Sequence, residues 1–340
     1  MPEDSESKHK HVTRRQHYVP RSYLCHFTSF APEDKNCIWT YDKNGGCPRL
    51  QSPVSSAVEK DIYSIKDSNT KPSDYIETEI LTPIENEALP ILDRLRLDDE
   101  SILNNAEFMK VVAYMAILHL RVPKSINRAK EFLEAGANEY LRLIGENPQK
   151  IKEWCKKRQG KDLGNALTEE QMTEAMKFPE KHVKIKAKKD YVLANILPQF
   201  QEIGKQLVML DWSICSSPDK YFFITSDTPV VVFCPYGKDK AKFGIGFALP
   251  QVEIHFPLSP TRCLFGSRRK YPLKWTMCRS DIDQVNMRCI YSAHRFVFSA
   301  FKSNRISKVV SKAVLTSKKE VINKEILREQ LKKHMEGHGK

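Results

Sequence analysis

Residues 221–233 read Tyr-Phe-Phe-Ile-Thr-Ser-Asp-Thr-Pro-Val-Val-Val-Phe, and this stretch decides the expected fold. β-Branched and aromatic residues favour strands, whereas the Asp-Thr-Pro sequence at 227–229 favours a turn. Two such runs on either side of a turn predict antiparallel strands. Runs of similar composition extend the predicted sheet through the C-terminal half, at 211–215, 252–256, 262–265 and 295–299.

Helical patterns cover much of the rest of the chain, most of them before these runs. The clearest pattern covers 105–121, where apolar side chains occupy most of the helix surface and predict a central, buried helix. A second pattern, at 73–95, contains Pro83 and Pro90, which should kink or divide it. The expected fold class is α+β, with an antiparallel sheet largely from the C-terminal half packed against central helices. Further helices are predicted at 125–144, 191–209, 281–293 and 318–334.

A β-hairpin is predicted nearer the N-terminus. Ile-Trp-Thr-Tyr at 38–41 has strand composition, and Asp-Lys-Asn-Gly-Gly at 42–46 is typical of a tight turn. Residues 48–50 would supply the returning strand.

Changes in composition divide the chain into an arm, a main domain with an insertion, and a terminal helix. Residues 1–15 are polar and predict a disordered arm. The main α+β domain should span 16–317, interrupted at about 146–190 by a basic, Lys-rich helical insertion. Residues 318–340 are predicted to form a basic C-terminal helix.

Positive charge is the strongest feature of the composition. The chain has 55 Lys and Arg residues against 42 Asp and Glu, a formal net charge of +13. The 150–189 and 318–340 segments carry much of this excess. Such runs attract polyanions through counterion release, which predicts nucleic acid as a partner of both segments. A Lys-rich helix can equally be a solvated face, so this alternative stays open.

Neither a membrane span nor a secretory signal is expected. No run approaches the roughly 18–20 apolar residues that a membrane helix needs, and the first ten residues contain no apolar segment. Nine cysteines are spread along the chain without a CxxC pair, which predicts reduced thiols and a cytoplasmic protein. Zinc binding near the N-terminus is an alternative, although the spacings there exceed those of the usual zinc knuckles. The residues concerned are Cys25, His26, Cys37 and Cys47.

Ionisable residues at predicted element ends are the candidate catalysts, since the chain has no nucleotide-binding, HExxH or GxSxG motif. His17 precedes Pro20, which favours an extended arm, and its ordinary pKa of about 6.5 suits an acid, a base or a ligand. Asp227 follows a predicted strand and therefore lies at a sheet end. Arg121 ends the apolar helix, where it needs a carboxylate or phosphate partner. Glu85 lies on an otherwise apolar helix stripe.

Several short motifs carry a resemblance to a known family. The chain has His-Tyr-Val-Pro at 17–20 followed by Tyr-Leu at 23–24, Lys-Asp-Ile-Tyr at 60–63, Arg-Val-Pro at 121–123 and Thr-Ser-Asp-Thr-Pro at 225–229. In these motifs, and in the helical Glu85, the chain resembles the domain-of-unknown-function 4238 family. The matching pieces are distributed over most of the chain apart from the insertion and the termini.

Folding of the N-terminal arm onto the sheet end would bring His17 to Asp227. The other two candidates, Arg121 and Glu85, would flank the same pocket. This arrangement predicts a metal-dependent phosphodiester hydrolase, a nuclease, in which carboxylates hold Mg²⁺ or Mn²⁺ and His17 is the general base or a ligand. Arg121 would stabilise charge that develops on the phosphate. The residues expected to contact the substrate are Tyr18, Arg21, Tyr23, Ser226 and Asn286.

The competing hypothesis is a non-catalytic module that binds nucleic acid or a protein. The aromatic and basic residues of the arm, together with the basic helices, would then contact the partner. Asp227 would close a turn by accepting from backbone amides two residues on, and Arg121 would form a buried ion pair with Glu85 between two helices. His17 would be a hydrogen-bonded strut.

Overall fold

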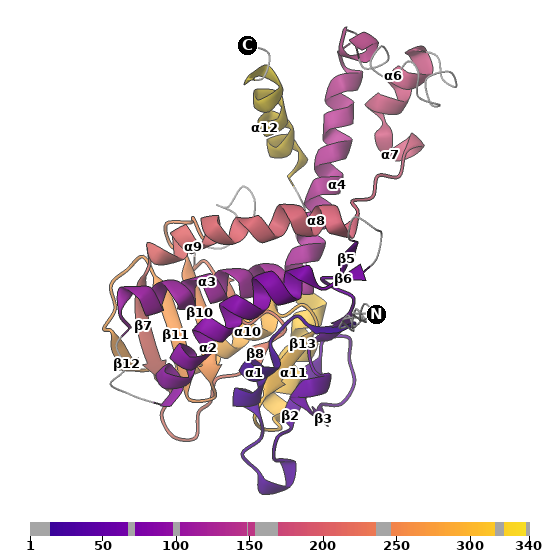
Figure 1. Cartoon of the computed structure of the whole chain (residues 1–340). Helices are drawn as coiled ribbons and strands as arrows, with labels where there is room; N and C mark the ends of the chain where they lie inside the picture. Colours follow the sequence, from indigo (N-terminus) through magenta and orange to yellow (C-terminus); the bar gives the residue numbers. More distant parts are fainter. Residues whose placement is uncertain are drawn as a thin grey trace, which may run out of the picture. The chain divides into compact units, whose positions relative to one another are not determined.

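The computed structural model in Figure 1 describes residues 14–66, 72–97, 103–147, 149–153, 169–235, 246–316 and 323–337. The chain forms two compact units. The first comprises 1–125, 195–236 and 245–317, and the second comprises 126–194, 237–244 and 318–340. The predicted disordered arm at 1–15 lies outside the described residues except for Arg14 and Arg15.

The first unit contains the antiparallel sheet that the C-terminal half predicts. Its strands are β7 (Asp211–Ser216), β9 (Val231–Phe233), β10 (Glu253–Ser259), β11 (Arg262–Ser267) and β12 (Lys274–Thr276). They lie in the order β12-β7-β11-β10-β9, and the pairs from β7 to β9 are all antiparallel. The exception is β12, which runs parallel to β7 at one edge.

A second sheet combines strands from both ends of the chain. Its members are β2 (Ile38–Asp42), β3 (Arg49–Gln51), β8 (Thr225–Ser226) and β13 (Phe296–Ser299). They lie in the order β3-β2-β13-β8, and every pair is antiparallel. The β2–β3 pair confirms the predicted hairpin. Gly45 and Gly46 in its turn have φ of +103° and +99°, a conformation that favours glycine.

The stretch 221–233 is divided between the two sheets instead of forming one strand pair. β8 belongs to the second sheet and β9 to the first, while 221–224 lie outside any ladder. The main chain of 222–224 bonds to a helix side chain instead. The Asn286 side chain accepts from Ile224 N at 3.0 Å and donates to Phe222 O at 2.8 Å. Backbone groups need partners but do not need a strand, so a helix side chain replaces the expected ladder.

The central helix of the first unit is α3 (Asn105–Arg121), as its apolar pattern predicts. It crosses one face of the five-stranded sheet together with α2 (Thr82–Leu97) and α9 (Phe200–Val208) (Figure 1). A capping box begins it, in which the Asn104 side chain accepts from Glu107 N at 2.9 Å. From Val111 onward most of its side chains are buried.

The predicted helix at 73–95 has a different interruption from the one that its prolines suggest. A π-helical segment, η4 (Ile76–Leu81), precedes α2, and Pro90 lies inside α2. The helix is therefore divided at 81–82, before either proline.

Helices α10 (Arg279–Ser292) and α11 (Asn304–Thr316) belong to the core on the other face of the five-stranded sheet. One apolar cluster contains Cys215 and Phe265 from the strands and Val285 from α10. The remaining short elements of this unit are β1 (Arg15–His17), α1 (Arg21–Leu24), η1 (Cys25–Phe27), η2 (Pro32–Asp34), η3 (Pro53–Ser55), β4 (Val58–Lys60), β5 (Ile65–Lys66), β6 (Pro72–Ser73) and η5 (Leu197–Gln199).

The second unit is helical and includes both the basic insertion and the C-terminal helix. Its helices are α6 (Glu169–Lys177), α7 (Pro179–His182), α12 (Lys324–Gly337) and the greater part of α4 (Pro123–Gly145) and of α8 (Lys189–Ile196). Ile144, Ile151 and Met176 form a small apolar core, against which Met172 and Met335 pack. The insertion expected at about 146–190 and the helix expected at 318–340 thus belong to one unit, which begins inside α4.

Two expectations from composition concern cysteines and membrane spans. The eight cysteines within the described ranges are free thiols, as predicted, and Cys155 lies outside those ranges. No helix in the described ranges combines the length and the apolar character that crossing a membrane requires.

Gly266 of β11 provides a test of how closely this sheet is packed. A Cβ at Gly266 would lie 2.8–2.9 Å from ring atoms of Trp212, whose Nε1 is fixed by a hydrogen bond to Leu207 O at 2.9 Å. We expect Gly266→Ala to lower the free energy of unfolding by about 1–3 kcal/mol, measured by urea denaturation. Gly204→Ala in α9 is the control: its Cβ would make an ordinary contact at 3.7 Å, and helix propensity should raise stability by about 0.5–1 kcal/mol. Equal effects of the two changes would contradict the prediction.

Candidate functional site

The buried guanidinium of Arg121 organises the residues that the sequence singled out. Arg121 ends α3 and is 3% exposed. Its Nη1 donates to Glu85 Oε1, its Nη2 donates to His17 O at 2.6 Å, and its Nε donates to the Tyr63 hydroxyl at 3.3 Å. The Tyr63 hydroxyl in turn donates to Arg121 O at 2.7 Å. These four residues are called the arginine cluster below.

The arginine cluster joins parts of the chain that are far apart in sequence. β1 pairs antiparallel with β4, so that His17 lies opposite Val58, and the chain then continues to Tyr63. Glu85 lies in the first turn of α2, and Arg121 lies at the end of α3. A planar guanidinium can hold several acceptors at once, and a buried one requires them. The cluster therefore attaches the end of β1 to the helices α2 and α3.

Burial and pairing together set the ionisation of the cluster. Burial alone would lower the pKa of Arg121, but the neighbouring Tyr63 and Glu85 outweigh burial and raise it. Burial raises the pKa of Tyr63 to about 12, although Arg121 opposes that shift. The cluster thus contains a permanent cation and a neutral phenol at ordinary pH.

Two polar residues that the sequence analysis did not single out, Gln16 and Glu77, adjoin the cluster. Gln16 is fully buried, and its Oε1 accepts from Tyr63 N at 2.8 Å. Glu77 lies in the π-helical segment η4; burial raises its pKa, while Gln16 and Arg121 oppose the shift. π-Helical turns occur frequently at functional sites. Glu77 has no sequence signal that separates it from other acidic residues nearby, whereas Gln16 directly precedes the His-Tyr-Val-Pro motif.

The imidazole of His17 has a partner of its own. Its Nε2 lies 3.2 Å from Val54 O, and the side chain is half-buried. Burial lowers the pKa of His17, the Val54 and Pro53 carbonyls oppose the shift, and Arg121 and Arg21 add to it. His17 is therefore a neutral ring that bridges two backbone segments.

Asp227 places its carboxylate on backbone amides. Its Oδ1 accepts from His294 N at 2.7 Å, and its Oδ2 accepts from Arg295 N at 2.6 Å and Phe296 N at 2.8 Å. The residue is 1% exposed, and burial raises its pKa while these three amides oppose the shift. Within the described ranges no hydrogen bond or ion pair joins Asp227 to His17. Asp227 closes the turn that leads into β13.

The aromatic residues expected to contact a substrate lie in the core. The Tyr23 hydroxyl donates to Pro257 O at 2.6 Å and lies 2.8 Å from Thr225 Oγ1. Tyr18 is buried, and burial followed by the charge of Asp227 raises its pKa. Both phenols are surrounded by protein.

The other expected substrate contacts divide into internal and exposed residues. The Ser226 hydroxyl accepts from Thr228 N at 3.2 Å, and Asn286 holds the main chain of 222–224 as described above. Arg21, in α1, is exposed. Arg21 alone among these five is placed to meet a partner from solvent.

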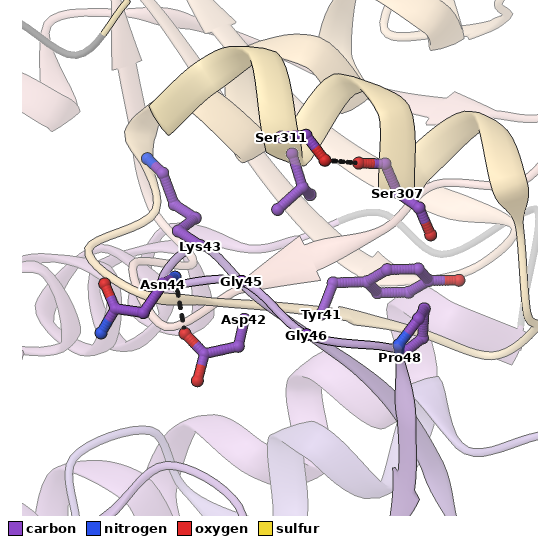
Figure 2. Close-up of a pocket in the computed structure, with 10 residues that line it drawn as sticks. Tyr41, Asp42, Lys43, Asn44, Gly45, Gly46, Pro48, Ser307 and Ser311 are labelled. Atoms are coloured by element: carbon purple, nitrogen blue, oxygen red, sulfur yellow. Dashed lines mark hydrogen bonds between the residues drawn. The ribbon is translucent and has the colours of Figure 1, made fainter. Parts of the chain in front are cut away.

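Figure 2 shows a hollow elsewhere in the first unit, between the β2–β3 turn and α11. Its volume is about 260 Å³, and its lining includes Lys43, Asp42 and Ser311. The Lys43 ammonium donates to Ala293 O at 2.9 Å, the Asp42 carboxylate pairs with Arg295 at 2.8 Å, and the Ser311 hydroxyl donates to a helix carbonyl. These three polar groups are engaged within the protein.

The residues that the structure describes contain no group of three or more His, Cys, Asp or Glu side chains that could hold a metal ion. The zinc alternative for Cys25, Cys37 and Cys47 finds no such group, and two of these thiols are exposed.

Comparison with protein-family models matches residues 15–303 to the family described as Protein of unknown function (DUF4238). The chain belongs to this family. The match confirms the resemblance that the motifs indicated, and its span includes all nine candidate residues, from His17 to Asn286. No curated protein and no solved structure matches this DUF4238 protein.

The second unit of the DUF4238 protein carries an exposed series of lysines. Lys184, Lys186 and Lys188, called the lysine row below, are exposed, whereas Ile185 and Ala187 between them are half-buried. Residues 183–188 are not helical, unlike the prediction for the insertion, and Ala187 N donates to Glu134 Oε1 at 3.0 Å. The Lys-Ile-Lys-Ala-Lys pattern has the period of two that is typical of extended chain, which explains the difference. Lys156, Lys157 and Arg158 lie outside the described residues.

The Asp227 geometry predicts a structural cost for removing its charge. In Asp227→Asn one amide nitrogen would face backbone N–H donors, so at least one buried amide loses its acceptor. We expect the free energy of unfolding to fall by about 1–3 kcal/mol in urea denaturation. The exposed Asp219→Asn should change it by less than about 0.5 kcal/mol. Unchanged stability in Asp227→Asn would contradict the assignment.

The lowered pKa of His17 predicts a pH dependence of stability. The unfolded chain, with an ordinary His pKa near 6.5, binds a proton before the folded chain does, so stability is present above about pH 6.5 and is lost as pH falls toward the folded value. Denaturation at about pH 7.5 and 5.5 should show a smaller difference in His17→Gln than in the wild type. The exposed His182→Gln should retain the wild-type difference. A wild-type pH difference in His17→Gln would contradict the prediction.

Proposed function

We propose that this DUF4238 protein binds nucleic acid through phosphate contacts made by the lysine row. The observation that carries the proposal is the exposure of Lys184, Lys186 and Lys188 on one side of an extended segment. Among the described residues, none of the three lysine side chains forms a hydrogen bond or an ion pair, although the Lys188 carbonyl accepts from Val192 N. Alternate residues of an extended chain are about 6.6 Å apart, so the row presents regularly spaced ammonium groups to a polyanion.

Ion pairs elsewhere in the second unit support the choice of the lysine row over the other basic residues of that unit. Arg142 pairs with Glu139 at 3.1 Å and also with Glu180, and Arg328 of α12 pairs with Glu139 at 3.5 Å and also with Glu146. The basic C-terminal helix thus has part of its charge neutralised within its own unit. The lysine row lacks such pairing, which distinguishes it from a solvated face laced with ion pairs.

The contacts of the first unit favour binding over catalysis. Arg121, Glu85 and Asp227 each have buried partners that hold the fold, and a reacting phosphate would have to displace them. Solvent-facing lysines bind phosphates without such rearrangement, and the counterions released give an affinity that depends on salt.

A charge-matched pair of variants tests the proposal. The substitutions Lys184→Gln, Lys186→Gln and Lys188→Gln together remove three charges from the row. We expect weaker binding of a labelled duplex of about 20 base pairs, and a slope of log K against log salt that is smaller by about 2–3, because each phosphate contact contributes about 0.9. Fluorescence anisotropy between about 50 and 200 mM salt measures both quantities.

The control removes the same charge from other places. Lys35, Lys60 and Lys220 are exposed and scattered over the first unit. Their triple change to Gln should leave the affinity and the salt slope close to those of the wild type. Equal losses in the two triple variants would show that net charge matters and the row does not, which would refute the proposal.

A metal-dependent phosphodiester hydrolase is the second candidate, and one observation favours it. Burial raises the pKa of the half-buried Glu77 carboxyl against the opposing effects of Gln16 and Arg121, and a carboxyl whose pKa burial raises can serve as a general acid. The same oligonucleotides incubated with Mg²⁺, with Mn²⁺ and with chelator provide the test. Cleavage that Glu77→Gln abolishes, with stability unchanged, would favour this candidate; intact oligonucleotides would leave binding as the proposed activity.

A further inference from the structure

The segment that contains β11 and β12 carries basic residues without any acidic residue among them. Residues 254–280 contain six Lys and Arg residues and no Asp or Glu. Five of these basic residues lie within 268–279, around the short edge strand β12 (Figure 1). The segment belongs to the first unit, so its charge is separate from that of the lysine row.

Aromatic rings accompany this charge. Tyr271 and Trp275 stack with their centroids 6.0 Å apart and their planes 16° from parallel. The rings of Tyr271 and of Phe265 in β11 also meet in a T-shaped arrangement, with their centroids 5.0 Å apart. Tyr271 is nevertheless 38% exposed, so the core orients the ring and solvent still reaches it.

The basic residues that precede and follow Tyr271 in the sequence differ in their contacts and in their exposure. Arg268 donates to Leu249 O at 3.3 Å and to Gln206 Oε1 at 3.1 Å, which fixes the chain where it leaves β11. Arg269 and Lys270 follow and are exposed. Lys274 is exposed at the start of β12. A ring that its aromatic neighbours hold in place therefore lies in a stretch of the sequence with exposed basic residues.

We infer that this surface, called the tyrosine platform, binds single-stranded nucleic acid, with a base stacked on Tyr271 and phosphates near Lys270 and Arg269. The inference rests on the proposed nucleic-acid binding and specifies its preferred strand form. Exposed aromatic rings in a basic surface hold unpaired bases, because every base has a π-face, whereas bases in a duplex are already stacked. Charge complementarity selects the anionic polymer, and the ring selects its unpaired bases.

Lysines on an edge strand have a second explanation. Charged side chains protect sheet edges from pairing with other chains, and β12 is such an edge. Edge protection requires charge but no exposed aromatic ring. The tyrosine platform contains both, and this combination separates the two explanations experimentally.

The decisive variant is Tyr271→Ala, with Tyr271→Phe as its matched control. Affinities are measured by anisotropy for a labelled oligothymidylate and a labelled duplex of equal length, about 20 nucleotides. Tyr271→Ala should weaken oligothymidylate binding roughly 5- to 100-fold and change duplex binding less than about twofold. Tyr271→Phe keeps the ring and should bind as the wild type does. Lys270→Gln, at an exposed position, should weaken oligothymidylate binding without affecting the fold.

Each other outcome has a separate meaning. Equal loss of single-strand and duplex affinity in Tyr271→Ala, or no loss of either, would overturn the inference and leave the platform as edge protection. Poly-glutamate of similar length carries charge without bases, so a loss of its binding equal to that of oligothymidylate would also overturn stacking. Binding that depends on the lysine row but not on Tyr271 would retain the proposed function alone. If the wild type bound neither oligonucleotide, both proposals would fail.

Discussion

The N-terminal half of the first unit depends on the burial of one positive charge. Arg121 is carried into the interior by α3, the most apolar helix of the unit, and its guanidinium must find acceptors there because a lone buried charge costs several kcal/mol. It finds them in Glu85, in the main chain of His17 and in the Tyr63 hydroxyl. The main chain at His17 is therefore positioned by the end of α3, and the His-Tyr-Val-Pro motif has an architectural role.

Asp227 has the equivalent role on the other side of the unit. It stands between β8 and β9, which belong to different sheets, and its carboxylate orders the amides that precede β13. One buried cation and one buried anion thus each hold together segments that are far apart in the sequence. Asp227 uses backbone amides alone, whereas Arg121 combines the His17 carbonyl with the Glu85 and Tyr63 side chains.

Charge in this DUF4238 protein is divided between interior and surface. The interior charges have partners that complete the fold, and the proposed function assigns contact with phosphate to surface charges. The lysine row and the tyrosine platform lie on different units and combine charge with different features, a regular spacing in one and an aromatic ring in the other. The two surfaces would make different kinds of contact with a polyanion, since phosphate attraction is independent of sequence and base stacking requires unpaired bases.

The sequence alone was sufficient for features that depend on neighbouring residues. Composition located β7, β9, β10, β11 and β13 but missed β12, the apolar helical pattern located α3, the Asn-Gly-Gly turn located the β2–β3 hairpin, and short motifs indicated the family. Only the tertiary structure decided what each element pairs with. Asn286 satisfies the backbone of 222–224, Gln16 and Glu77 adjoin the arginine cluster, and the insertion shares a unit with the C-terminal helix. Periodicity and propensity are local properties, whereas a partner for a buried charge or an unpaired amide is selected by distance in the folded chain, across separations that no local pattern records.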